Sequence, residues 1–210
     1  MKEAGTVKFS YDSDGGQLAP FPGFDELNAT RQELRRLGLL GSDESGLGFG
    51  NVSLRDASGC FHITGSGSGV LPVLTLGDYA KVIAWDFARN WLRSAGRAIA
   101  SAESLTHAAV YSMEAQARVV VHGHKSDLWR SLLERGPATA LGVTYGTPQM
   151  AGEVQRLFRE TDVRTRKIFA MAGHEDGIVV FGPDFRQVLA TLAAAYPEAN
   201  RTECVSVKRE

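Results

Sequence analysis

The sequence predicts a single α/β domain with a largely antiparallel sheet. Segments whose apolar residues recur at helical spacing alternate with short segments typical of strands, and one pair of strand segments flanks a tight turn. The chain has 210 residues, of which 43% are hydrophobic and 22% charged, so it is long enough to bury one substantial core. No repeat, low-complexity tract or linker divides it.

The N-terminal half predicts an arm, a helix and two pairs of strands. Residues 1–23 begin with a polar, glycine-rich stretch, and we expect a flexible arm there, before a domain over residues 24–210. Leucines at helical spacing predict a helix from Phe24 to Leu39. Residues 51–64 alternate apolar and polar side chains around an Asp-Ala-Ser-Gly turn, which predicts a hairpin. Residues 80–94 predict a second pair of strands.

Helices and strands alternate in the C-terminal half as well. Helices are expected over residues 101–117, over residues 125–135, after Thr147 with Pro148 at the first helical position, and from Asp184 onward. Strands are expected in the short, mostly apolar runs at residues 118–122, 167–172 and 177–182.

Composition excludes several classes of function. The formal net charge is -1 and there is no basic stripe, so we expect neither nucleic acid nor a membrane as a partner. No apolar run approaches the roughly 18 residues that cross a bilayer, and the first residues lack the apolar stretch of a secretory signal. Cys60 and Cys204 suggest neither a disulfide scaffold nor a CxxC pair. We therefore expect a cytoplasmic protein.

Two of the histidines suggest a metal site. His122 and His124 follow a short apolar run, and on a strand they would face the same side, about 7 Å apart at Cα. Two imidazoles on one face can converge on one metal ion. A pair of polar residues at the end of a strand explains the same motif, so a third ligand is needed to favour metal binding.

His174 is our candidate for that third ligand. It lies in a turn between two expected strands, and the acidic residues Glu175 and Asp176 after it either orient an imidazole or form a solvated turn. Three histidines with an open fourth position are typical of a catalytic zinc site. Iron, cobalt, nickel or manganese suit the same ligands. We set a cupin aside, because the next glutamate after the histidine pair, Glu134, lies in a helical stretch.

Glu103 is the candidate acid or base. It lies at the start of an expected helix, where the helix dipole alone also favours a carboxylate. His107, one turn later on the same face, is either a packed helix residue or a group that supports the site. His62 alternates with apolar neighbours on an expected strand, and we expect it to point to solvent and to have no role.

Two glycine-rich segments offer groups that can hold an anion. Residues 46–51 and 64–69 combine glycines with small polar side chains, and loops of this kind cradle anions through their backbone N–H groups. Such segments are more often plain turns. Neither matches a P-loop or a dinucleotide-binding fingerprint.

Five short motifs, taken in order, resemble the class II aldolase/adducin family. They are Gly-Asn-Val-Ser-Leu-Arg at 50–55, Phe-His-Ile-Thr-Gly-Ser-Gly at 61–67, Ser-Ala-Glu at 101–103 with His-Ala-Ala-Val-Tyr at 107–111, Val-Val-His-Gly-His at 120–124 and Gly-His-Glu-Asp-Gly at 173–177. The resemblance covers about residues 25–195. It implies an α/β/α fold with a central, mainly antiparallel sheet.

The resemblance also implies roles for individual residues. His122, His124 and His174 match zinc ligands, and Glu103 matches an acid/base carboxylate. The residues that match those holding a substrate phosphate are Asn51, Ser66, Gly67 and Ser101. The implied protein is a zinc-dependent lyase (aldolase, dehydratase or decarboxylase) that assembles as a homotetramer. It would act through a metal-stabilised enediolate on a small hydroxy-carbonyl compound such as a sugar phosphate.

The chain departs from the family pattern in ways that bear on the reaction. Ala102 stands where the motif usually has a serine, and two acidic residues separate His174 from the following glycine. The regions that in the aldolase carry tyrosines for a neighbouring subunit's site are short here, and Tyr145 and Tyr196 are poor substitutes. The alternative function is a non-catalytic, adducin-like interaction module. Adducin-type domains lose the metal histidines, whereas this chain has all three.

Overall fold

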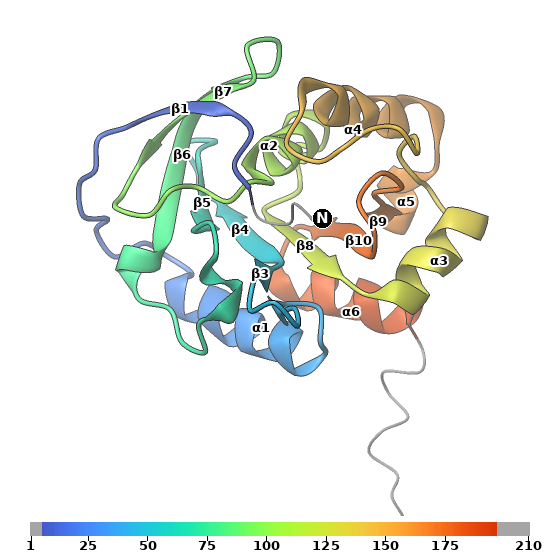
Figure 1. The fold of residues 1–210 in the computed structure, drawn as a ribbon, viewed down its shortest axis with the longest axis horizontal. Helices are drawn as coiled ribbons and strands as arrows, with labels where there is room; N and C mark the ends of the chain where they lie inside the picture. The colour runs from blue at the N-terminus through green and yellow to red at the C-terminus, as the bar shows by residue number, and fades with distance from the viewer. Residues whose placement is uncertain (1–5, 197–210) are drawn as a thin grey trace, which may run out of the picture.

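The structure is a computed structural model that describes residues 6–196 (Figure 1). The strands are β1 (Ser10–Ser13), β2 (Gly41–Ser42), β3 (Gly48–Phe49), β4 (Asn51–Arg55), β5 (Phe61–Thr64), β6 (Tyr79–Asp86), β7 (Trp91–Ala95), β8 (Val119–His124), β9 (Ile168–Ala170) and β10 (Gly177–Gly182). The helices are α1 (Phe24–Arg36), α2 (Ser104–Met113), α3 (Ser126–Arg135), α4 (Pro148–Glu160), α5 (Val163–Arg166) and α6 (Phe185–Ala195). Two short 3₁₀ turns are η1 (Ser68–Val70) and η2 (Leu76–Asp78).

Eight strands form one sheet in the order β1-β7-β6-β5-β4-β8-β10-β9. Every neighbouring pair in it is antiparallel except β1 with β7, which is parallel. The short strands β2 and β3 form a separate hairpin. The predicted fold class, an α/β protein with a mainly antiparallel central sheet, is confirmed. No helix among residues 6–196 is long and apolar enough to cross a bilayer.

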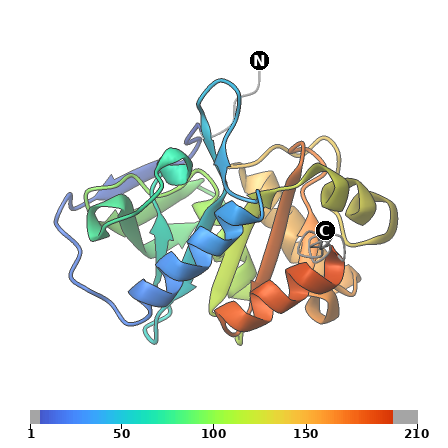
Figure 2. The same ribbon diagram turned by 90° about the horizontal axis from the view of Figure 1, so that it is seen from below.

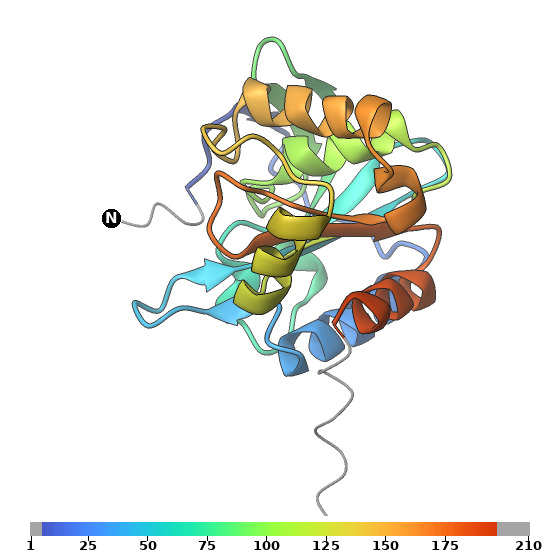
Figure 3. The same cartoon turned by 90° about the vertical axis from the view of Figure 1, so that its right-hand side faces the viewer.

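Helices cover both faces of the sheet. The sheet therefore separates two hydrophobic cores, one on each face. Figures 2 and 3 show α2 and α4 on one side and α1 and α6 on the other. Leu105 and Val154 belong to the first core, and Leu27 and Leu192 to the second. The central strands β8 and β10 are buried on both faces, which explains why their sequences are apolar runs rather than alternating patterns.

Local signals place most element ends correctly. Thr147 caps α4, because its side chain accepts a hydrogen bond from the N–H of Met150, with Pro148 at the first helical position. The strand expected over residues 177–182 is β10 without change. The helix expected over residues 101–117 is shorter, because α2 covers only Ser104–Met113.

The prediction of a flexible arm over residues 1–23 is wrong for residues 6–23, the part that the structure describes. Ser10–Ser13 form β1 and pair with β7, and Phe9, Leu18 and Phe21 are buried. Phe9 packs into the first core, and Leu18 and Phe21 pack into the second. Residues 1–5 and 197–210, including Cys204, lie outside the described residues.

The expected solvent exposure of His62 is also wrong. Its imidazole is buried and stacks on the Phe21 ring, with centroids 3.7 Å apart and planes inclined by 8°. Burial, with a smaller effect of the Lys81 charge, lowers the pKa of His62 to about 4. The N-terminal segment therefore covers a face of β5 that sequence periodicity alone assigns to water.

His62 should make the stability of the fold depend on pH. Its folded pKa of about 4 lies below its ordinary value of 6.5, so the unfolded chain binds more protons between these values. The stabilisation is complete above about pH 6.5 and is lost as the pH falls toward 4. In His62→Phe, which keeps a ring against Phe21, this loss should disappear.

Urea unfolding of both proteins at several pH values between 7 and 4 tests this expectation. The other buried histidines titrate in both proteins, so the difference between the two curves isolates His62. The free energy of unfolding of His62→Phe should rise relative to the wild type as the pH falls. Parallel curves would contradict the burial of His62.

Candidate active site

Three histidines converge where β8 ends beside the turn between β9 and β10. His122 and His124 lie on one face of β8, as the period of two along a strand requires. His174 lies in the β9–β10 turn. One ring nitrogen from each of the three lies within 4.8 Å of the others, and the Nε2 atoms of His124 and His174 are 3.0 Å apart. The predicted cluster is therefore present.

Two glycines make this convergence sterically possible. A Cβ atom on Gly123, between the two β8 histidines, would lie 2.9 Å from the Leu39 carbonyl oxygen, and the N–H of His124 donates to that same oxygen. A Cβ atom on Gly177 would lie 2.6 Å from Cδ2 of His174. A side chain at either position would therefore displace the backbone or the imidazole.

The local environment favours the neutral forms of His122 and His174. Nδ1 of His122 lies 3.1 Å from the Ile178 carbonyl oxygen, and because a carbonyl only accepts, Nδ1 carries the proton and Nε2 is free to act as a ligand. Burial and the neighbouring imidazoles hold the pKa of His122 well below its usual range. Burial also lowers the pKa of His174 to about 3. Neutral imidazoles are the form that binds metal.

Glu103 lies beside the histidines at the start of α2. Its side chain makes no capping hydrogen bond, so it does not serve the helix end. Oε2 accepts a hydrogen bond of 2.7 Å from Thr106, whereas Oε1 is buried without a hydrogen-bond partner among the described residues, 3.9 Å from Nε2 of His174. Burial raises the pKa of Glu103 to about 7, against the opposing effects of the Thr106 hydrogen bond and the Lys8 charge.

The residues expected to hold a phosphate lie in the same pocket. The pocket and the open solvent at its mouth together hold about 410 Å³ of empty space. Its lining includes all eight predicted site residues: Asn51, Ser66, Gly67, Ser101, Glu103, His122, His124 and His174. Oδ1 of Asn51 is buried and has no hydrogen-bond partner in the described part of the chain. Buried polar atoms are normally paired, so two orphaned oxygens in one pocket, on Asn51 and Glu103, indicate a site built for a ligand.

Two arginines of α1 form hydrogen bonds to the loop at residues 68–71, which is part of the pocket wall. The sequence analysis did not identify these arginines. Arg31 is only 1% exposed, and its guanidinium donates to the carbonyl oxygens of Ser68 and Leu71 at 2.8 and 2.6 Å. Arg35, one turn later, donates to the Gly69 carbonyl. In the sequence both look like the ordinary charged face of a helix, because their partners lie more than thirty residues away.

The structure also places Tyr145, Tyr196 and His107. Tyr145 lines the pocket, and its ring centroid lies 4.7 Å from that of His174, so it belongs to the site. Tyr196 lies elsewhere, in an apolar groove between α1 and α6. Of the two alternatives for His107, the structure favours packing: the residue is fully buried outside the pocket, and its Nδ1 lies 2.7 Å from the Ser53 hydroxyl.

Comparison with solved structures supports the fold. L-Fuculose 1-phosphate aldolase superposes with a TM-score of 0.62 at 17% identity over 93% of this chain and 94% of the other. A sugar-phosphate aldolase from Thermotoga maritima gives 0.60 at 14% identity over 88% and 95%. YgbL from Klebsiella pneumoniae, described as a candidate aldolase, epimerase or decarboxylase, gives 0.61 at 20% identity over 88% and 90%. At these identities the likeness concerns the fold alone.

Comparison at the level of sequence identifies the family. No curated protein matches the chain. The family described as the class II aldolase and adducin N-terminal domain matches residues 34–196, a range that includes all eight predicted site residues. The chain therefore belongs to the class II aldolase/adducin family.

Proposed function

We propose that the protein is a metal-dependent lyase that acts on a small hydroxy-carbonyl compound, a sugar phosphate. One observation carries the proposal: an unpartnered carboxylate oxygen of Glu103 lies 3.9 Å from Nε2 of His174, one of three clustered histidines. A metal-binding group and an acid/base group side by side in one pocket suit a reaction that moves a proton next to a carbonyl. The family membership supports the same class of enzyme.

The histidine cluster fits a divalent metal, with zinc as our proposed ion. The three ring nitrogens are close enough to share one ion, and burial favours the neutral imidazoles of His122 and His174. His122 has the hydrogen bond to a backbone carbonyl that commonly orients a metal-binding histidine. A divalent metal held by His122, His124 and His174 supplies Lewis acidity toward an oxygen of the substrate.

Glu103 would act as the base and then as the acid. With a pKa of about 7, its carboxyl is present in both protonation states near neutral pH. Oε1 can then take a proton from the substrate and return it in a later step, while Thr106 holds Oε2 in place. The low exposure of Glu103, 3%, keeps water from competing for that proton.

The polar wall of the pocket would bind the substrate phosphate. Asn51, Ser66, Gly67 and Ser101 provide small polar side chains or close backbone approach there. Oδ1 of Asn51 is buried without a partner among the described residues, and because a phosphate oxygen accepts hydrogen bonds, Asn51 would contact the phosphate through Nδ2. Ala102 has no hydroxyl to add, which should weaken phosphate binding. Together with the shortened regions that carry tyrosines in the aldolase, this favours chemistry that needs only the metal and Glu103, such as loss of water or carbon dioxide, over aldol cleavage.

The alternative, a non-catalytic interaction module, is less well supported. A binding module has no need of three converging imidazoles or of a buried carboxyl with a raised pKa. Perturbed titratable groups that gather in one pocket are typical of catalytic sites. We therefore favour an enzyme.

The first test of this proposal concerns the metal. The purified protein should carry about one zinc or similar divalent ion per chain, measured by elemental mass spectrometry. His122→Ala and His124→Ala should each lose the ion with their circular dichroism spectra largely unchanged. His62→Phe is the matched control, since it removes a buried histidine outside the pocket and should keep the ion. Stoichiometric metal in both alanine variants would refute the ligand assignment.

The second test concerns Glu103. In Glu103→Gln the metal should remain bound, and turnover should fall by roughly 10²–10⁴, the usual contribution of a positioned proton-transfer group. Deuterium uptake next to the carbonyl, followed by NMR in D2O with a panel of keto-sugar phosphates, measures this step. Glu134→Gln, an exposed carboxylate on α3, should behave as the wild type. Equal rates for the wild type and Glu103→Gln would remove Glu103 from the mechanism.

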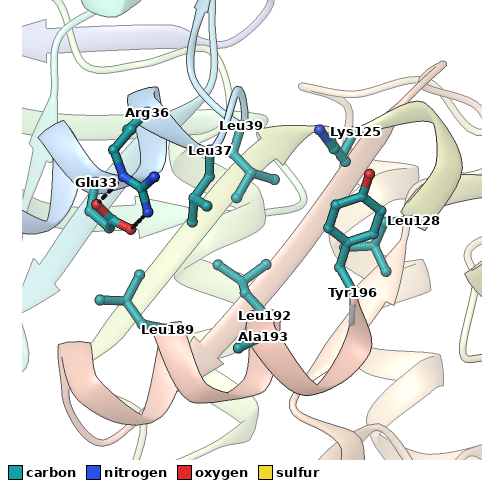
Figure 4. A pocket seen from close by; sticks show the side chains of 10 residues that line it. All are labelled: Glu33, Arg36, Leu37, Leu39, Lys125, Leu128, Leu189, Leu192, Ala193 and Tyr196. Atoms are coloured by element: carbon teal, nitrogen blue, oxygen red, sulfur yellow. Dashed lines mark hydrogen bonds and ion pairs between the residues drawn. The ribbon is translucent and has the colours of Figure 1, made fainter. Parts of the chain in front are cut away.

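We also propose that the chain assembles as a homotetramer through α6. Leu189 and Ala193 on α6, together with Leu37 and Leu39, line an apolar groove beside α1 (Figure 4). Contiguous apolar surface of this kind commonly marks an interface. Light scattering at micromolar concentration should give the mass of a tetramer.

A charged substitution in the groove should weaken this assembly. Leu189→Glu places a carboxylate among the apolar groove residues, whereas Ala190→Glu places one on the exposed side of the same helix and should leave the mass unchanged. A wild-type protein that is a monomer at micromolar concentration would contradict the proposal.

A further inference from the structure

We propose that Lys8, held against Tyr145, binds a second anionic group of the substrate, separate from the phosphate. This inference rests on the proposed function, because it assigns a substrate-binding residue to the same pocket. It concerns a segment that precedes the region matched by the family, residues 34–196, so the family match assigns it no role.

The backbone around Lys8 is tied to the loop that carries Tyr145. Nδ2 of Asn90 donates to the carbonyl oxygens of both Lys8 and Gly146, at 3.0 and 3.2 Å. Asn90 has a φ of 47°, which turns the chain between β6 and β7 toward these two carbonyls. Ser10, two residues after Lys8, begins β1 and pairs with Trp91. The side chain of Lys8 therefore starts from a fixed point beside Tyr145.

The Lys8 ammonium lies over the ring of a pocket residue. Its Nζ is 4.1 Å from the centroid of the Tyr145 ring, within the range of a cation–π contact. The Tyr145 ring centroid is in turn 4.7 Å from that of His174, and Tyr145 is 6% exposed. The positive charge is thus one aromatic ring away from the histidine cluster.

Lys8 supplies a charge that the pocket lining lacks. Among the described residues that line the pocket there is no lysine or arginine. Lys8 lies outside this lining, and its ammonium contacts the ring of Tyr145, which is a lining residue. An anion bound beside Tyr145 would be attracted to this charge.

Two compounds that share a phosphate separate this role from phosphate binding. 3-Phosphoglycerate has a carboxylate where glycerol 3-phosphate has a CH₂OH group. Isothermal titration of the zinc-loaded protein with each compound measures both affinities. In Lys8→Met, which keeps the aliphatic stem, 3-phosphoglycerate should bind about tenfold to a hundredfold more weakly, as expected for loss of one hydrogen bond to a charged group. Glycerol 3-phosphate should bind as before, which also reports an intact fold.

Two further variants serve as controls. Lys8→Arg keeps the charge and should retain most of the affinity for 3-phosphoglycerate. Lys167→Met removes an ammonium from a similar position over an aromatic ring, 5.4 Å from the centroid of Phe181 and outside the lining of the histidine pocket. It should change the affinity for neither compound.

The possible failures differ from one another. If neither compound binds the zinc-loaded wild type, the proposed sugar-phosphate function fails and this inference fails with it. If both compounds bind and Lys8→Met leaves both affinities unchanged, the function stands and the inference is wrong. Equal weakening of both compounds in Lys8→Met would place Lys8 at the phosphate instead and would also refute the inference.

Discussion

The register of β8 against its two neighbours is the constraint on which the site depends. β8 pairs with β4 so that Asn51 lies opposite His122, and with β10 so that Gly177 lies opposite His124. Because side chains alternate along a strand, a shift of one residue in either pairing would send the β8 histidines into the opposite core and part them from His174. The apolar residues Val119–Val121, buried between two helical layers, make such a shift costly. The packing of these valines thus determines where the histidines at the end of β8 lie.

Two buried polar atoms in the pocket lower the stability of the folded state. The pocket holds a carboxyl oxygen of Glu103 and an amide oxygen of Asn51 that are buried without hydrogen-bond partners among the described residues. Each such atom costs about 1–3 kcal/mol, a large fraction of the stability of an ordinary domain. The surrounding structure is correspondingly rigid: Arg31 bonds one wall, and close glycine contacts at Gly123 and Gly177 leave the backbone little room to relax. Unpaired groups persist where the scaffold prevents them from finding partners, and a ligand can then provide the missing contacts.

The parts of the site that sequence reasoning predicted are those defined by local patterns. His122 and His124 share a face because of strand alternation, which two residues suffice to reveal, and Glu103 lies at a helix start that its neighbours indicate. The residues that it missed depend on contacts between distant segments. Phe21 covers His62 from forty-one residues away, and Arg31 reaches carbonyls in a loop that no spacing rule connects to α1. Tyr145 has no obvious partner in the sequence pattern, and it is the fold of the chain itself that brings its ring to His174.

The two lysine–tyrosine contacts show why such placement matters more than residue type. Lys8 over Tyr145 and Lys125 over Tyr196 are similar contacts, 4.1 and 5.0 Å from ammonium to ring centroid. Tyr196 lies in a groove lined largely by leucines, and Lys125 also lines a second cavity that His124 and His174 share. Tyr145 lies against a histidine of the cluster, in the pocket that holds a carboxyl whose pKa is near neutrality, so a charge held over its ring would act near the proposed acid/base group. The N-terminal segment contributes the Lys8–Tyr145 contact, so a segment outside the pocket lining places a positive charge beside the site.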